Sequence, residues 1–249
     1  MFNLANLIYE PEHLEHLCTF EHEAKECNKS MSWRNTFRII FAISHVVLIC
    51  WWMFLYGWDS FEQYLSNWGT CFVLVSLSVS ASLPYCKDYK KRPGLMAFNH
   101  TMLSLSVVIE MIVTIVYWTL LHEDVMERNA GNPLALYYQY AAHTIPTIAC
   151  LYNFMVTDFL FYRGYSKVLT CLTVIYLSTN CIKTKVTGNV AYWFLRFDDI
   201  MSIYICLFFM ILSIFLPYLL ANLSECIKGR KFNTDNTGPK QNDLQKTSA

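Results

Sequence analysis

The stretch Ile200–Asn222 reads IMSIYICLFFMILSIFLPYLLAN and contains no Asp, Glu, Lys or Arg. About 20 apolar residues in a helix span the hydrocarbon core of a bilayer, so this stretch predicts a membrane-spanning helix. Five further stretches have the same character, with Glu110 as their only charged residue. They are Ile39–Tyr56, Tyr64–Leu83, Met96–Leu121, Leu134–Thr157 and Val168–Ile182. The sequence therefore predicts an all-α fold, a six-span transmembrane helical bundle over residues 36–225.

The composition supports a protein embedded in lipid. Hydrophobic residues make up 55% of the 249 residues and charged residues 15%, whereas soluble domains carry about 25% charged residues. A soluble helix needs a polar face, and six apolar stretches in series lack one. The net charge of zero does not favour a nucleic-acid partner. The sequence contains neither a CxxC pair nor a glycine-rich phosphate loop, so we expect no metal site and no cofactor. His13, His16 and His22 have metal-like spacing, but a solvated charged helix accounts for them more simply.

Basic residues gather on alternate loops and so predict the orientation. The loops expected on one side hold Arg34, Arg38, Lys87, Lys90, Lys91, Arg92, Arg163, Lys167, Lys228, Arg230 and Lys231. The positive-inside rule then places both termini in the cytosol, as a polar segment 1–35 and a disordered tail 226–249. The sequons at Asn28, Asn99 and Asn222 would lie in the cytosol or the membrane, so we expect no glycosylation there. The chain is expected in the endoplasmic reticulum or plasma membrane.

Four ionisable side chains fall inside the expected spans, where such groups default to a functional hypothesis. They are His45, His100, Glu110 and His143. Glu110 and His100 fit a second alternative function, a transporter or channel with a polar pathway across the membrane. His143 is expected roughly 13 Å below the outer surface at 1.5 Å per helical residue. On the same scale Ser66 is expected at roughly 3–6 Å, a difference that a tilted helix would bridge.

A hydroxyl within reach of an imidazole is the minimum nucleophile–base pair, so Ser66 and His143 are the candidate catalytic residues. A third polar group usually orients the imidazole. The candidates for this supporting role are Asn67, Glu110, Tyr64 and Thr144. The plainer alternative is structural, because helical serines mostly bond their own backbone and buried histidines often donate between helices.

Four motifs, in order and spacing, resemble the androgen-induced family of multi-pass membrane proteins and the related rolling stone proteins. They are Tyr64-Leu65-Ser66-Asn67-Trp68-Gly69, Val113-Thr114-Ile115-Val116-Tyr117-Trp118 with Asp124 beyond it, Ala142-His143-Thr144 with Pro146, and Val186-Thr187-Gly188 followed by Tyr192. The resemblance covers roughly residues 36–225 and excludes both termini.

The resemblance implies a membrane-embedded hydrolase of fatty acid esters of hydroxy fatty acids. In that family an intramembrane threonine and a histidine act together, and they fall at Ser66 and His143 of this sequence. The expected partner is a membrane lipid or lipid ester that reaches the site laterally. The rolling stone likeness implies the alternative, a non-enzymatic membrane protein of cell fusion, adhesion or signalling, with membrane-protein partners that the sequence does not name.

Overall fold

The computed structural model describes residues 33–59, 61–86, 93–157 and 160–228. These residues form helices and connecting turns, without a strand among them. The α-helices are α3 (Trp33–Tyr56), α4 (Leu65–Ser82), α5 (Pro93–Val116), α6 (His122–Arg128), α7 (Pro133–Ala142), α8 (Ile145–Val156), α9 (Tyr165–Thr187) and α10 (Ile200–Lys228). Two 3-10 turns, η3 (Phe61–Gln63) and η4 (Leu83–Tyr85), and a π-helix, η6 (Tyr117–Leu121), adjoin them. The expected all-α class is confirmed.

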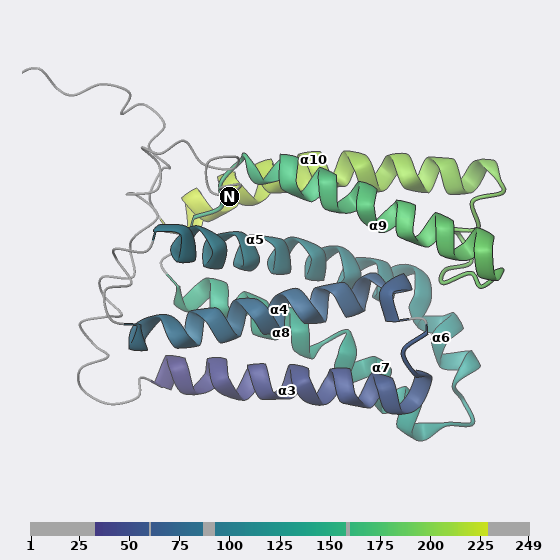
Figure 1. The fold of residues 1–249 in the computed structure, drawn as a ribbon, viewed down its shortest axis with the longest axis horizontal. Coiled ribbons are helices and arrows are strands. Elements are labelled where there is room, and N and C mark those ends of the chain that lie inside the picture. Colours follow the sequence, from purple (N-terminus) through teal and green to yellow (C-terminus); the bar gives the residue numbers. More distant parts are fainter. Residues whose placement is uncertain (1–32, 60, 87–92, 158–159, 229–249) are drawn as a thin grey trace, which may run out of the picture.

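The helices run back and forth along one axis (Figure 1). Figure 1 shows that α3 begins and α10 ends at the same end of the bundle, while α6, the start of α4 and the start of α10 lie at the other. We call the latter the α6 end. Helix α5 is the most enclosed of the long helices, and α3 and α10 have mostly exposed surfaces.

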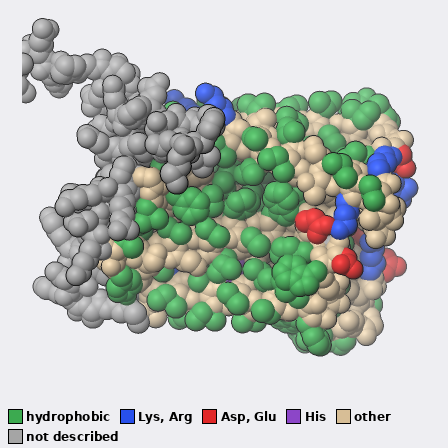
Figure 2. Space-filling view, viewed as in Figure 1, with side chains coloured by type: hydrophobic (Ala, Val, Ile, Leu, Met, Phe, Trp, Pro, Cys, Tyr) green, Lys and Arg blue, Asp and Glu red, His purple; other side chains and the backbone are tan. Residues whose placement is uncertain are grey.

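Four helical segments are long and apolar enough to cross a membrane, which indicates a membrane-associated protein. They are Trp33–Tyr56, Leu65–Tyr85, Gly94–Arg128 and Ile200–Ile227. Their outward side chains are large and apolar; Phe54, Ile211 and Phe215 are each more than 60% exposed. Figure 2 shows hydrophobic side chains along the flank of the bundle and charged side chains gathered at the α6 end. This distribution suits lipid around the flank and water at the end.

The two other expected spans differ from the prediction. The expected span 134–157 is two helices, α7 and α8, separated by a turn at His143 and Thr144. Pro146 explains the break, because it has no N–H to donate to the carbonyl of Ala142 and its ring would clash with that carbonyl. The expected span 168–182 lies within the longer helix α9. This helix contains more polar residues, and it is not among the four segments that are apolar enough to cross a membrane.

The ends of the predicted bundle also shift. Helix α3 begins at Trp33, so residues 33–35 are helical rather than part of the N-terminal segment. Helix α10 continues through Pro217 to Lys228, inside the predicted tail. Arg38, expected as a loop charge, is buried in α3, where its guanidinium donates to Asn153 Oδ1 and Thr157 Oγ1, each at 2.9 Å.

Candidate functional site

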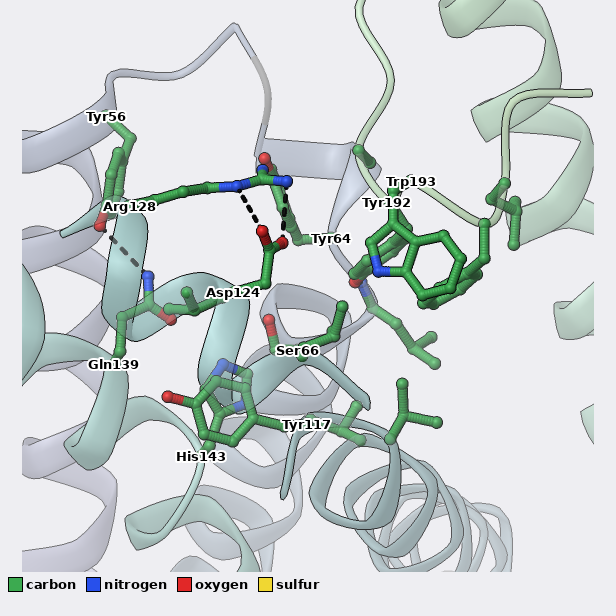
Figure 3. A pocket seen from close by; sticks show the side chains of 18 of the residues that line it. Tyr56, Tyr64, Ser66, Tyr117, Asp124, Arg128, Gln139, His143, Tyr192 and Trp193 are labelled. Carbon is green, nitrogen blue, oxygen red and sulfur yellow. Dashed lines mark hydrogen bonds and ion pairs between the residues drawn. The ribbon is translucent and has the colours of Figure 1, made fainter. Parts of the chain in front are cut away.

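A cavity of about 290 Å³ opens at the α6 end of the bundle and contains both candidate catalytic residues. Its walls come from α3, α4, α5, η6, α6, α7, α9, α10 and the loop before α10. Ser66 and His143 line it together with Tyr64. Figure 3 shows the Ser66 hydroxyl between the Asp124 carboxylate and the His143 imidazole in this view, with the Tyr117 ring over the imidazole. Two residues that are 77 positions apart in the sequence therefore face one space.

Ser66 lies in the first turn of α4, and neighbouring elements hold that turn in place. Tyr64 precedes the helix in an extended conformation without a side-chain cap. The cap is supplied from elsewhere, since the Leu65 N–H donates to the Tyr192 hydroxyl oxygen at 3.0 Å. Tyr176 on α9 donates to the carbonyl of Gln63 at 2.9 Å. The first contact satisfies an N–H that a helix start leaves without a partner, and the second attaches the preceding 3-10 turn to α9.

An ion pair ties the preceding 3-10 turn to α9. The Lys183 ammonium contacts the Glu62 carboxylate. Partial burial by itself raises the pKa of Glu62, but the hydrogen bond and charge of Lys183 outweigh it, so the pKa lies below its ordinary value. Glu62 therefore stays ionised at neutral pH and keeps the turn attached to α9.

His143 lies at the break that Pro146 imposes between α7 and α8. Its ring is stacked on Tyr117, with ring centroids 3.7 Å apart and planes 12° apart. Both residues are buried, His143 at 8% exposure and Tyr117 at 1%. Nδ1 of His143 has no hydrogen-bond partner within the described part of the chain, so stacking takes the place of the usual orienting hydrogen bond. Tyr117 begins the π-helix η6, a form that recurs at functional sites.

Charged and amide groups form the mouth of the cavity. Arg128 pairs with Asp124 through two contacts, Nε to Oδ1 at 3.0 Å and the terminal nitrogen to Oδ2 at 2.8 Å. Gln139 donates to the Tyr56 hydroxyl at 3.2 Å. Below this mouth the wall is apolar, with Val113, Val116, Leu195 and other side chains. The cavity thus combines a polar opening with a largely apolar interior, a common composition of small-molecule sites.

Three of the four expected supporting residues lie elsewhere. Only Tyr64 lines the cavity. The amide of Asn67 donates to the carbonyl of Phe61 at 2.9 Å and is therefore occupied. Thr144 is exposed on the outside of the turn. Glu110 is fully buried against Gly69, and neither of its carboxylate oxygens has a hydrogen-bond partner among the described residues.

Other sequence candidates do not join the site. His100 bonds the hydroxyl of Tyr165 on α9, and neither His100 nor Glu110 lines the cavity. His45 contacts the carbonyl of Phe41 within its own helix. Asn99 is buried and accepts from Ser80. His13, His16, His22 and Asn28 lie outside the described residues.

The sequence-based reasoning missed several residues of the cavity. Trp52, near the end of the first apolar stretch, is 5% exposed and lines the cavity. Tyr117 gave no signal beyond its place in a motif. Asp124 and Arg128 have the i, i+4 spacing of a helical ion pair, which would have predicted their contact.

Comparisons with protein-family models, with curated proteins and with solved structures found no match to this chain.

Proposed function

We propose that this protein is an intramembrane hydrolase of carboxylic esters carried by lipids, with Ser66 as nucleophile and His143 as general base. Fatty acid esters of hydroxy fatty acids are the substrate class that the family resemblance favours. One observation supports the proposal most strongly: a single cavity with an apolar interior is lined by a hydroxyl and an imidazole from distant parts of the chain.

The proposed reaction has two steps. Nε2 of His143 accepts the proton of Ser66 Oγ while the oxygen attacks the ester carbonyl, and the proton then passes to the departing alcohol oxygen as the C–O bond breaks. Water next loses a proton to the same nitrogen and attacks the acyl-serine, which releases the fatty acid and restores Ser66. The polar mouth beside Asp124 and Arg128 provides the route by which water arrives.

The oxyanion of the tetrahedral intermediate needs donors. Asn67, the donor suggested by the sequence, is engaged with Phe61. The Ser66 N–H at the start of α4 offers an alternative, because the N–H groups of Leu65 and Asn67 beside it are already bonded, to the Tyr192 hydroxyl and to the Tyr64 carbonyl, and the helix dipole is positive there. Donors of this kind stabilise developing negative charge and cost no reorganisation. We therefore assign this role to the Ser66 N–H at the start of α4.

We infer that α7–α8 and α9 also cross the membrane, which gives six spans. Helix α9 lies antiparallel to α10 in the bundle, and Val174, Ile175, Ile182 and Val186 are exposed on it. A proline-broken membrane helix is tolerated where its free backbone lines a cavity, as the turn at His143 does. With six spans and cytosolic ends, the α6 end faces the lumen or the exterior. The endoplasmic reticulum and the plasma membrane both fit this topology.

The proposal is tested by labelling purified protein in detergent with a lipophilic fluorophosphonate. Labelling is expected in the wild type and in Ser78→Ala, a control in which an exposed serine of the same helix is removed. It is expected to disappear in Ser66→Ala and in His143→Ala. Hydrolysis of lipid esters by the same four proteins gives the second measurement.

The alternatives predict other results. A folded, monodisperse wild type that neither labels nor hydrolyses esters would favour a non-enzymatic protein of fusion, adhesion or signalling. Proton-coupled flux in liposomes that disappears in Glu110→Gln would favour a transporter. Labelling that persists in Ser66→Ala would show that another residue reacts.

A further inference from the structure

A second, smaller cavity of about 30 Å³ lies between α4, α5, α9 and α10. It shares three lining residues with the first cavity: Leu65, Tyr176 and Phe209. The two spaces therefore adjoin, with these three side chains between them.

On each helix that lines both cavities, the residues that line only the second cavity lie farther from the α6 end than those that line the first. On α4 the lining residues pass from Leu65 to Phe72, and on α9 from Tyr176 back to Leu169. Each of these steps is seven residues, or about 10 Å of helix. Because α4 begins at the α6 end and α9 finishes there, both steps lead away from the mouth and into the bundle. Helix α5 agrees, since Val116 lines the first cavity and Ile109 the second.

The second cavity presents few hydrogen-bonding groups to an occupant. Its polar aromatic residues are bonded elsewhere: Trp68 Nε1 donates to the carbonyl of Glu62 at 2.8 Å, and the Tyr176 hydroxyl donates to that of Gln63. Ser213 donates to the carbonyl of Met210 at 2.8 Å. The remaining lining is mostly aliphatic and aromatic. Apart from the Thr173 hydroxyl, the lining offers an occupant few polar partners, so an apolar occupant fits this space best.

We propose that the second cavity is an acyl-chain subsite: it receives the far end of the chain whose ester group lies at Ser66, and its residues set the preferred chain length. This inference rests on the proposed hydrolase function. Its small volume suits the end of a chain, and it adjoins the cavity of the reacting centre at the shared residues Leu65, Tyr176 and Phe209. A short acyl chain ends in the first cavity and does not reach it.

Thr173 on α9 lines the second cavity only, and the next residue, Val174, is 46% exposed on the outside of the helix. Thr173→Phe places a ring in the subsite, and Val174→Phe adds a similar ring to the lipid-facing surface as the matched control. The measured quantity is the ratio of kcat/KM for nitrophenyl palmitate to that for nitrophenyl butyrate. Thr173→Phe should lower this ratio at least about tenfold, since a displacement of the reacting ester by an ångström costs on the order of a hundredfold.

Leu172→Ala provides a variant in the opposite direction. It removes volume from the lining of the second cavity and should raise the ratio, so the inference stays testable if Thr173→Phe does not fold. Val174→Phe should leave the ratio unchanged. An equal loss on both esters, or an unchanged ratio in both Thr173→Phe and Leu172→Ala, would overturn the inference while leaving the hydrolase function in place.

Chain binding can also be measured without hydrolysis. Trp68 lines the second cavity, so a fatty acid brominated along its chain should quench tryptophan fluorescence more in the wild type than in Trp68→Phe. Thr173→Phe should remove this difference and Val174→Phe should retain it. Quenching of this kind in a protein that hydrolyses no ester would support the subsite and reject the proposed function. Absence of any Trp68-dependent quenching would overturn the subsite.

Discussion

Gly69 lies one turn beyond Ser66 on α4, where α4 meets α5, and its replacement by alanine tests how closely these helices approach. A Cβ at this position would overlap Oε1 of Glu110 and lie 3.0 Å from Cδ of Glu110 and 3.2 Å from Cγ2 of Ile109. Carbon atoms pack favourably at about 3.5–4.0 Å, so the added methyl group requires α4 or the Glu110 side chain to move.

The expected cost follows from two opposing effects. Overpacking of a filled core costs about 1–3 kcal/mol. Alanine in a helix regains about 0.5–1 kcal/mol relative to glycine. The carboxyl of Glu110 ends a flexible side chain, but the residue is fully buried, so its movement is restricted. The net loss of unfolding free energy is at most about 2.5 kcal/mol, and the restricted carboxyl places it in the upper part of the range, about 1–2.5 kcal/mol, which lowers the thermal midpoint by about 2–10 °C in a chain of this length.

Thermal unfolding of purified protein in detergent measures this effect. The matched control is Gly94→Ala in the first turn of α5, where an added Cβ meets no atom within 4 Å. Gly94→Ala should leave the midpoint unchanged or raise it. In a Glu110→Ala background, which removes the carboxyl, Gly69→Ala should cost about 1 kcal/mol less than in the wild type. A Gly69→Ala protein as stable as the wild type, or an equal penalty in both backgrounds, would refute this account of the α4–α5 contact.

Three further predictions concern the elements around the site. The depressed pKa of Glu62 stabilises the fold above the ordinary value of 4.5, and this contribution is lost as the pH falls through the lower folded-state pKa. Lys183→Met removes the ion pair, so acidification should lower the unfolding free energy less in this variant than in the wild type. The difference should be no more than about 1 kcal/mol because the pair is partly exposed, and thermal unfolding at neutral and acidic pH measures it. Asn153→Ala removes a hydrogen-bond acceptor of the buried Arg38 and should lower the unfolding free energy by about 1.5–3 kcal/mol, measured by chemical or thermal unfolding. An unchanged unfolding midpoint would show that this hydrogen bond does not stabilise the fold. Tyr117→Leu should lower kcat for ester hydrolysis roughly two- to tenfold, the equivalent of about 0.5–1.5 kcal/mol of aromatic stacking on His143. Tyr117→Phe keeps the ring and should retain most of the wild-type kcat. Equal activity of the two variants would show that the ring does not orient the histidine.

The sequence predicted the helical class and the approximate positions of the long apolar helices, because both depend on local composition. Pro146 in the fourth apolar stretch indicates a disturbance of that helix, because proline lacks the N–H that an intrahelical bond needs. The sequence did not predict that the helix would stop at Ala142, since a proline in a membrane helix can cause either a kink or a break. Which one occurs depends on packing around the turn, including the Tyr117 ring on His143.

The remaining differences arise from contacts between distant residues. Arg38 resembles a loop charge in the sequence, but its partner Asn153 is 115 residues away on α8. Trp52 fits an interfacial belt by position, yet it packs against Tyr138 and Tyr64 around the cavity. The π-helix that begins at Tyr117 has no known local signature in this sequence. Local patterns do not contain this information, because each of these features depends on a neighbouring helix.

The position of the cavity follows from how the chain satisfies its backbone at the α6 end. Non-helical backbone at membrane depth is tolerated only where it is buried in protein or lines a water-filled space. The turn at His143 and the extended Tyr64 before α4 both interrupt helices, and both residues line the same cavity. At the start of α4 the Tyr192 hydroxyl accepts from the Leu65 N–H and so stabilises the turn that presents Ser66. Under the proposed hydrolase function, a variant that removes this cap should therefore lower ester hydrolysis before it unfolds the bundle.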